Sequence, residues 1–89
     1  MKNTLVQEII SRKLTDEFNP DVLLIVDESE KHANHNSDAL KGGTHFRIKM
    51  SSKKFIGMSK VEQHRSVYAV LDDEIKNGVH ALALTLQPA

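Results

Sequence analysis

The sequence predicts an α+β domain in which two helices cover one face of a three-stranded sheet. Two stretches place apolar residues at helical spacing, three shorter runs are typical of strands, and Gly, Pro or Asn residues separate them. The chain has 89 residues and a mass of 10.0 kDa, which allows one modest core. Residues 1–89 are therefore expected to form a single domain.

The first helix is predicted over residues 4–18, and Pro20 follows its end. The apolar run within residues 21–28 is short and partly β-branched, so it predicts the first strand. The first helix presents a stripe of apolar residues at helical spacing: Leu5, Val6, Ile9, Ile10, Leu14 and Phe18.

Residues 29–44 are predicted to form a long flexible loop, because they show no usable hydrophobic periodicity. Loops beyond about 12–15 residues are uncommon in compact domains, and many of them carry function. This loop holds two histidines, His32 and His35, separated by two residues. In a helical segment such a pair can chelate one metal ion, whereas in a loop the spacing can equally be accidental.

Residues 45–50 alternate between apolar and polar side chains, which predicts a half-buried antiparallel strand. Phe46, Ile48 and Met50 share the face expected to meet the core. An apolar turn over residues 55–58 follows this strand.

The second helix is predicted to begin at the capping box of Ser59 and Glu62 and to end at Asn77-Gly78. The last strand is predicted over residues 79–86, with His80 and three leucines on one face. The expected apolar stripe of the second helix consists of Val61, His64, Tyr68, Leu71 and Ile75, widened by Val67 and Val70.

The net charge is zero, yet the middle of the chain is basic. Residues 41–65 contain seven Lys or Arg residues against Glu62 alone, a net charge of +6, while residues 1–40 sum to −4 and residues 66–89 to −2. This segment is either a solvated face balanced by the acidic ends or a surface for a phosphate, a nucleic acid or an acidic protein. Its basic residues are Lys41, Arg47, Lys49, Lys53, Lys54, Lys60 and Arg65.

Composition excludes several classes of function. The chain has no Cys, so it cannot form disulfides, thiolate zinc sites or a cysteine nucleophile, and it cannot hold an iron–sulfur cluster on its own thiolates. It contains no nucleophile elbow, zinc-protease motif or phosphate loop, so an enzyme is not expected. No apolar run approaches the roughly 20 residues that span a bilayer, and the expected location is the cytoplasm.

Five histidines are the unusual feature of the composition. His is a common metal ligand and acid–base group, but each position also has a structural explanation. His64 lies on the predicted apolar stripe and is expected to be structural, and His45 is expected to face solvent or to lie at the edge of the sheet. His80 begins the last strand, where it either packs with leucines or emerges at the rim of the sheet.

Four motifs occur in order along the chain: His45-Phe46, Phe55-Ile56-Gly57, His64-Arg65-Ser66-Val67-Tyr68 and Val79-His80-Ala81-Leu82. Together they closely resemble the pattern of the BolA family, and the resemblance covers nearly the whole chain. The resemblance implies an αββααβ fold similar to the class II KH fold, with a three-stranded mixed sheet. It also implies a short helix near residues 59–63, where the periodicity shows a single turn.

The resemblance further implies a role as an adaptor for a monothiol glutaredoxin, in iron–sulfur cluster trafficking or in iron or redox regulation. The partner and a glutathione would supply thiolates to a shared 2Fe–2S cluster, and the isolated chain would carry none. The implied ligands here are His80 and a loop histidine. His32 follows an acidic, Ser-containing stretch that fits the family best, and His35 is the alternative.

Some members of this family are described as transcriptional regulators, so DNA binding is the alternative function. The chain lacks the GxxG loop through which KH folds hold nucleic acid. A DNA or partner surface would instead use the basic residues Arg47, Lys49, Lys53, Lys54, Lys60 and Arg65.

Overall fold

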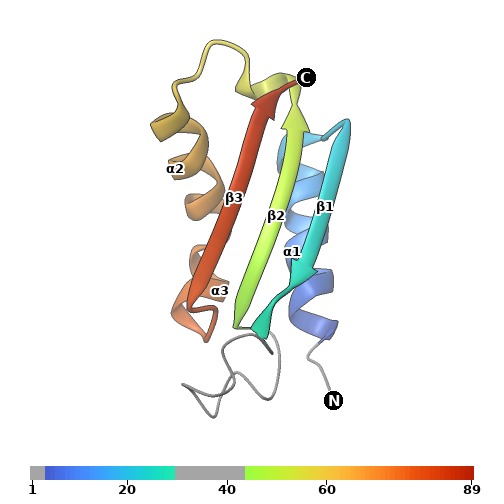
Figure 1. The fold of residues 1–89 in the computed structure, drawn as a ribbon, viewed down its shortest axis with the longest axis vertical. Coiled ribbons are helices and arrows are strands. Elements are labelled where there is room, and N and C mark those ends of the chain that lie inside the picture. The colour runs from blue at the N-terminus through green and yellow to red at the C-terminus, as the bar shows by residue number, and fades with distance from the viewer. Residues whose placement is uncertain (1–3, 30–43) are drawn as a thin grey trace.

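A computed structural model describes residues 4–29 and 44–89, and Figure 1 shows how its elements are arranged. They follow the order α1 (Thr4–Phe18), β1 (Val22–Asp27), β2 (His45–Ser52), η3 (Lys53–Phe55), α2 (Lys60–Val70), α3 (Asp72–Lys76) and β3 (Ala81–Pro88), where η3 is a 3₁₀ turn. The predicted α+β class, the first helix and the three strands are confirmed. None of the helices described is both long and apolar enough to cross a membrane.

The three strands form one mixed sheet in the order β1-β2-β3. Strand β2 runs antiparallel to β1, with Val22 opposite Ser51, and parallel to β3, with His45 opposite Ala81. Parallel neighbours need a long crossover connection, which α2 and α3 provide here. The prediction of an antiparallel strand at residues 45–50 is therefore correct for one of its two neighbours.

In Figure 1, α1 lies behind the sheet, and α2 and α3 lie beside and behind β3. No described helix covers the front face of the sheet. The strands follow this division, because successive side chains on a strand point to opposite faces. On β2, Phe46, Ile48 and Met50 are buried toward the helices, whereas Arg47 and Lys49 are exposed on the opposite face.

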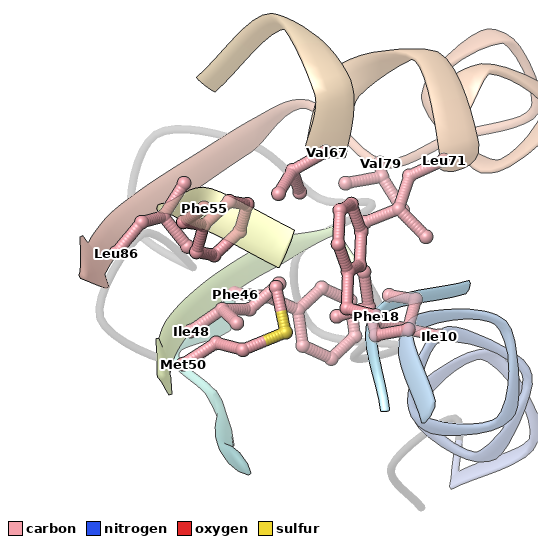
Figure 2. Close-up of a cluster of buried hydrophobic side chains, with 11 residues drawn as sticks. Ile10, Phe18, Phe46, Ile48, Met50, Phe55, Val67, Leu71, Val79 and Leu86 are labelled. Atoms are coloured by element: carbon pink, nitrogen blue, oxygen red, sulfur yellow. The ribbon is translucent and has the colours of Figure 1, made fainter. Parts of the chain in front are cut away.

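Figure 2 shows the core, which lies between the sheet and the helices. The rings of Phe18 and Phe55 contact each other with centroids 5.2 Å apart and planes inclined by 41°. The buried apolar side chains are Ile10, Leu14, Phe18, Phe46, Ile48, Met50, Phe55, Val67, Leu71, Val79 and Leu86. The core thus joins apolar side chains of the helices to the buried face of the sheet.

The predicted stripe of the second helix is rotated relative to the face that α2 buries. Val61 and Tyr68 are 57% and 42% exposed, so the expectation that they belong to the core is wrong. Val67 and Leu71 of the predicted stripe are buried as expected, and Gln63 joins them on the buried face at helical spacing. The side-chain amide nitrogen of Gln63 donates to the Met58 carbonyl at 3.1 Å, whereas its buried Oε1 accepts no hydrogen bond from the described residues.

The second helix is also shorter than predicted. It ends at Val70, and a separate helix, α3, covers residues 72–76. Leu71 joins them with φ −99° and ψ 17°, outside the helical region, while its side chain stays fully buried. The short helix expected near residues 59–63 is not present, since those residues begin α2, and the additional helix of the αββααβ order is α3.

The start of α2 is fixed by the predicted capping box. The Ser59 hydroxyl accepts from the Glu62 N–H at 3.1 Å, and the Ser59 N–H donates to the Glu62 carboxylate at 2.8 Å. The hydrogen bond that the Ser59 backbone N–H donates to the Glu62 carboxylate, with a smaller effect of the Ser59 side chain, lowers the pKa of Glu62 below its ordinary value, since it favours the charged form.

Truncating the ring of Phe55, which is fully buried, is expected to destabilise the domain. Phe55→Ala should lower the free energy of unfolding by about 3–5 kcal/mol, through lost burial and the remaining cavity. The neighbouring Ile56 is 63% exposed and provides the control, because Ile56→Ala should change stability by less than about 0.5 kcal/mol. Urea denaturation followed by far-UV circular dichroism measures both, and equal losses would contradict the core assignment.

Candidate metal-ligand site at one end of the sheet

The end of β1 and the beginnings of β2 and β3 meet at the same end of the sheet, the lower end in Figure 1. This follows from the strand directions, because β1 runs opposite to the other two. The three segments 27–29, 44–46 and 80–81 are therefore neighbours in space although they lie far apart in the sequence. His80, which the sequence singles out, lies in this junction.

The backbone of Thr44 joins the three segments. Its N–H donates to the Ser29 hydroxyl oxygen at 3.0 Å, on the side of β1. Its carbonyl accepts from the N–H groups of His80 and Ala81 at 2.7 and 3.2 Å, on the side of β3. Thr44 is only 6% exposed, so these hydrogen bonds are shielded from solvent and costly to leave unmade.

Ser29 is the second anchor of the junction and is 1% exposed. Its hydroxyl donates to the Asp27 carboxylate at 2.5 Å and also accepts from the His45 N–H at 3.3 Å. The Ser29 N–H donates to the same Asp27 oxygen at 2.9 Å. Ser29 and Thr44 are the described residues on either side of residues 30–43. The hydrogen bond between them holds the two ends of the predicted loop together beside His80.

The imidazole of His80 is exposed, whereas its backbone is held by the Thr44 carbonyl. The ring of His45 lies almost parallel to it, with centroids 5.8 Å apart and planes inclined by 17°. His45 also contacts the Thr44 hydroxyl through its Nδ1 atom at 2.8 Å. Sequence reasoning placed His45 in solvent or at the sheet edge, whereas it is half-buried on the central strand. It also missed this pairing, which depends on β2 and β3 being parallel neighbours.

The other predicted site residues are distributed differently. His32, His35 and Lys41 lie outside the described residues. His64 is half-buried on α2, away from the junction. Within residues 4–29 and 44–89, no three His, Asp or Glu side chains lie close enough together to hold a metal ion.

The described basic residues do not form one patch. Arg47 and Lys49 lie on the open face of the sheet, where the Arg47 guanidinium contacts the Glu28 carboxylate at 3.1 Å. Lys53 and Lys54 lie on η3, which follows the far end of β2, and Lys54 contacts Glu17 at 3.4 Å. Lys60 and Arg65 are on α2.

An open groove of about 400 Å³ runs along α2, and both of these basic residues line it. Its floor is mainly apolar because Val61 and Tyr68 are turned outward. The Lys60 ammonium donates to the Leu86 carbonyl of β3 at 2.7 Å. Arg65 makes no ion pair with any residue that the structure describes.

Comparisons with known proteins agree with this architecture. A family model described as BolA-like protein matches residues 14–89. A DNA-binding transcriptional regulator BolA of Vibrio cholerae is 37% identical over 81 residues, covering 90% of this chain and 72% of the relative.

Two solved structures from Arabidopsis thaliana are similar over 99% of this chain, each at 35% identity. BolA1 has a TM-score of 0.82 with 94% of its chain covered, and the BolA domain of SufE1 has a TM-score of 0.84 with 95% covered. The fold implied by the sequence motifs is thereby confirmed.

Removing the hydroxyl of Ser29 is expected to loosen the junction. Ser29→Ala leaves the buried Thr44 N–H without its acceptor, so the free energy of unfolding should fall by about 1–3 kcal/mol. Ser11→Ala on α1 is the matched control, with an expected change below about 0.5 kcal/mol. Urea denaturation measures the stability and amide hydrogen exchange at Thr44 measures the local opening. If both variants behave alike, the Ser29 hydroxyl does not anchor the loop.

Proposed function

This chain belongs to the BolA-like protein family, and on that premise we propose that it supplies histidine ligands to a 2Fe–2S cluster shared with a monothiol glutaredoxin and glutathione. The proposed role is that of a non-catalytic adaptor in iron–sulfur cluster trafficking or in iron or redox regulation. One observation carries the proposal: the exposed His80 follows the same Thr44 anchor that, together with Ser29, holds the two ends of the histidine-bearing loop.

The donor set fits such a shared group. The chain has no Cys, so every thiolate must come from the partner and from glutathione. Neutral imidazole nitrogens are established ligands of 2Fe–2S clusters in which the other iron keeps thiolates. When bound, the cluster supplies one-electron redox chemistry, and imidazole ligation raises its reduction potential relative to thiolate ligation alone. His80 would provide one of the two imidazoles.

A loop histidine would provide the other. His32 is the third residue after Ser29, and an extended chain advances by roughly 3.5 Å per residue, so its reach from the anchored Ser29 is about 11 Å. His35, the sixth residue, reaches about 21 Å by the same measure. Both values are upper limits, since they assume a fully extended chain. Whether His32 or His35 is the loop ligand is therefore decided by substituting each residue.

The proposed ligation also has a pH dependence. An imidazole ligates only when its nitrogen lone pair is free, so protonation competes with the iron. Association with the cluster-loaded partner should therefore weaken as the solution becomes acidic. The isolated protein is expected to be colourless, because it holds no thiolate of its own.

The decisive experiment is a titration of this protein into 2Fe–2S-loaded monothiol glutaredoxin with glutathione, followed by visible circular dichroism of the cluster. The wild type should change the spectrum with a one-to-one end point, and His80→Ala should abolish the change. Comparison of His32→Ala with His35→Ala identifies the loop ligand. His64→Ala, which alters a histidine on α2, should behave as the wild type.

Two results would contradict the proposal. If the wild type leaves the spectrum unchanged, the proposed shared cluster is excluded. If His80→Ala changes the spectrum as the wild type does, His80 is not a ligand. A brown protein purified without the glutaredoxin would show that the chain holds its cluster in another way.

DNA binding is the second candidate, favoured by the name of the Vibrio cholerae relative, a DNA-binding transcriptional regulator. Lys60 and Arg65 line one groove on α2 and are suited to contact phosphates. The remaining basic residues are divided between the open sheet face and η3, so we assign the DNA contact to α2.

Fluorescence anisotropy with a short DNA duplex at several salt concentrations tests this candidate. The slope of log K against log salt is negative, and each lost phosphate contact reduces its magnitude by about 0.9. Arg65→Ala should therefore make the slope less steep by that amount. Lys49→Ala, on the opposite face of the sheet, should leave it unchanged. Binding without salt dependence, or an equal effect of both variants, would rule out a DNA contact on α2.

A further inference from the structure

The parallel arrangement of His45 and His80 is the feature that the proposed function does not use. The register of β2 and β3 places His45 opposite Ala81, the residue directly after His80. The two rings lie with centroids 5.8 Å apart and planes 17° from parallel. This separation falls within the range of 4.5–7 Å typical of interacting aromatic rings.

The two rings are held to different degrees. The ring of His45 contacts the Thr44 hydroxyl at 2.8 Å, and Thr44 is buried and bonded through its N–H to Ser29. His80 is fixed only through its backbone, and no described residue makes a hydrogen bond to its ring. The ring of His45 is thus the anchored surface, and the ring of His80 rests against it.

His45 bears on the site through its contact with the His80 ring. The two rings lie 17° from parallel with centroids 5.8 Å apart, so the orientation of one ring limits the space open to the other.

We propose that His45 is a positioning residue, which holds the His80 imidazole in one orientation before the cluster-bearing partner arrives. The inference rests on the proposed function of His80 as a ligand. A side chain that is already ordered loses less conformational freedom on binding, and one ordered side chain accounts for a two- to tenfold change in affinity. His45 therefore sets the affinity of the site without entering its coordination.

The isolated protein provides the first test. The three-bond couplings of the His80 β-protons, measured by NMR, should report one χ1 rotamer in the wild type. They should be averaged over rotamers in His45→Ala. His45→Phe keeps an aromatic ring at this position but loses the contact with the Thr44 hydroxyl, so its couplings should lie between those of the wild type and those of His45→Ala. Couplings that are averaged already in the wild type, or unchanged in His45→Ala, would overturn the inference.

The second test repeats the titration into the cluster-loaded glutaredoxin. His45→Ala should weaken the association two- to tenfold, whereas His45→Phe should stay within twofold of the wild type. The spectrum at saturation should be the same for all three, since the ligands are unchanged. Loss of the spectral change in both variants would make His45 a ligand, and wild-type affinity in His45→Ala would leave it without a role.

These measurements separate the inference from the function on which it rests. If the wild type fails to change the cluster spectrum, the proposed function is wrong, and the NMR couplings still decide whether His45 orients His80. If His80→Ala abolishes the change while both His45 variants match the wild type, the function stands and the positioning role is wrong. Urea denaturation of each variant verifies that it is folded.

Discussion

The hydrogen bonds of the Thr44 backbone are the constraint on which the candidate site depends. They tie the end of β1, through Ser29, to the start of β3 at His80. Sheet pairing alone brings β3 beside β2, but it does not fix the segments that precede and follow the strands. With this buried connection the exposed histidine has a defined backbone, and the loop of residues 30–43 leaves and re-enters the domain next to it.

Much of the fold could be predicted from hydrophobic periodicity, and the exceptions have a common origin. The alternation along β2 and the apolar stripe of α1 are strong because each has one buried face. On α2, two sets of positions share helical spacing, and hydropathy favours Val61 over Gln63. The structure buries Gln63, whose amide nitrogen donates to the Met58 carbonyl while its oxygen accepts no hydrogen bond from the described residues. Which of the two sets is buried depends on contacts with residues outside the helix, and the local sequence pattern does not contain those contacts.

The candidate site was predictable only in part for the same reason. His80 stands in a motif that the sequence presents directly, and the loop histidines were evident from composition. The pairing of His45 with His80 was not, since it requires the parallel register of β2 and β3. Likewise the basic segment of residues 41–65 is continuous in the sequence, yet the strand alternation and the crossover divide its described residues among separate surfaces. Charge along a chain does not determine charge over a surface.

The parallel pairing of β2 with β3 also has a consequence for the order of folding. These strands are separated by η3, α2 and α3, so their contacts close a long stretch of chain, and such non-local contacts are slow to form. The hairpin-like pair of β1 and β2 is not local either, because residues 28–44 intervene. The junction around Thr44 needs both pairings at once. The two histidines therefore come together only in the completed domain, after both long-range pairings have formed.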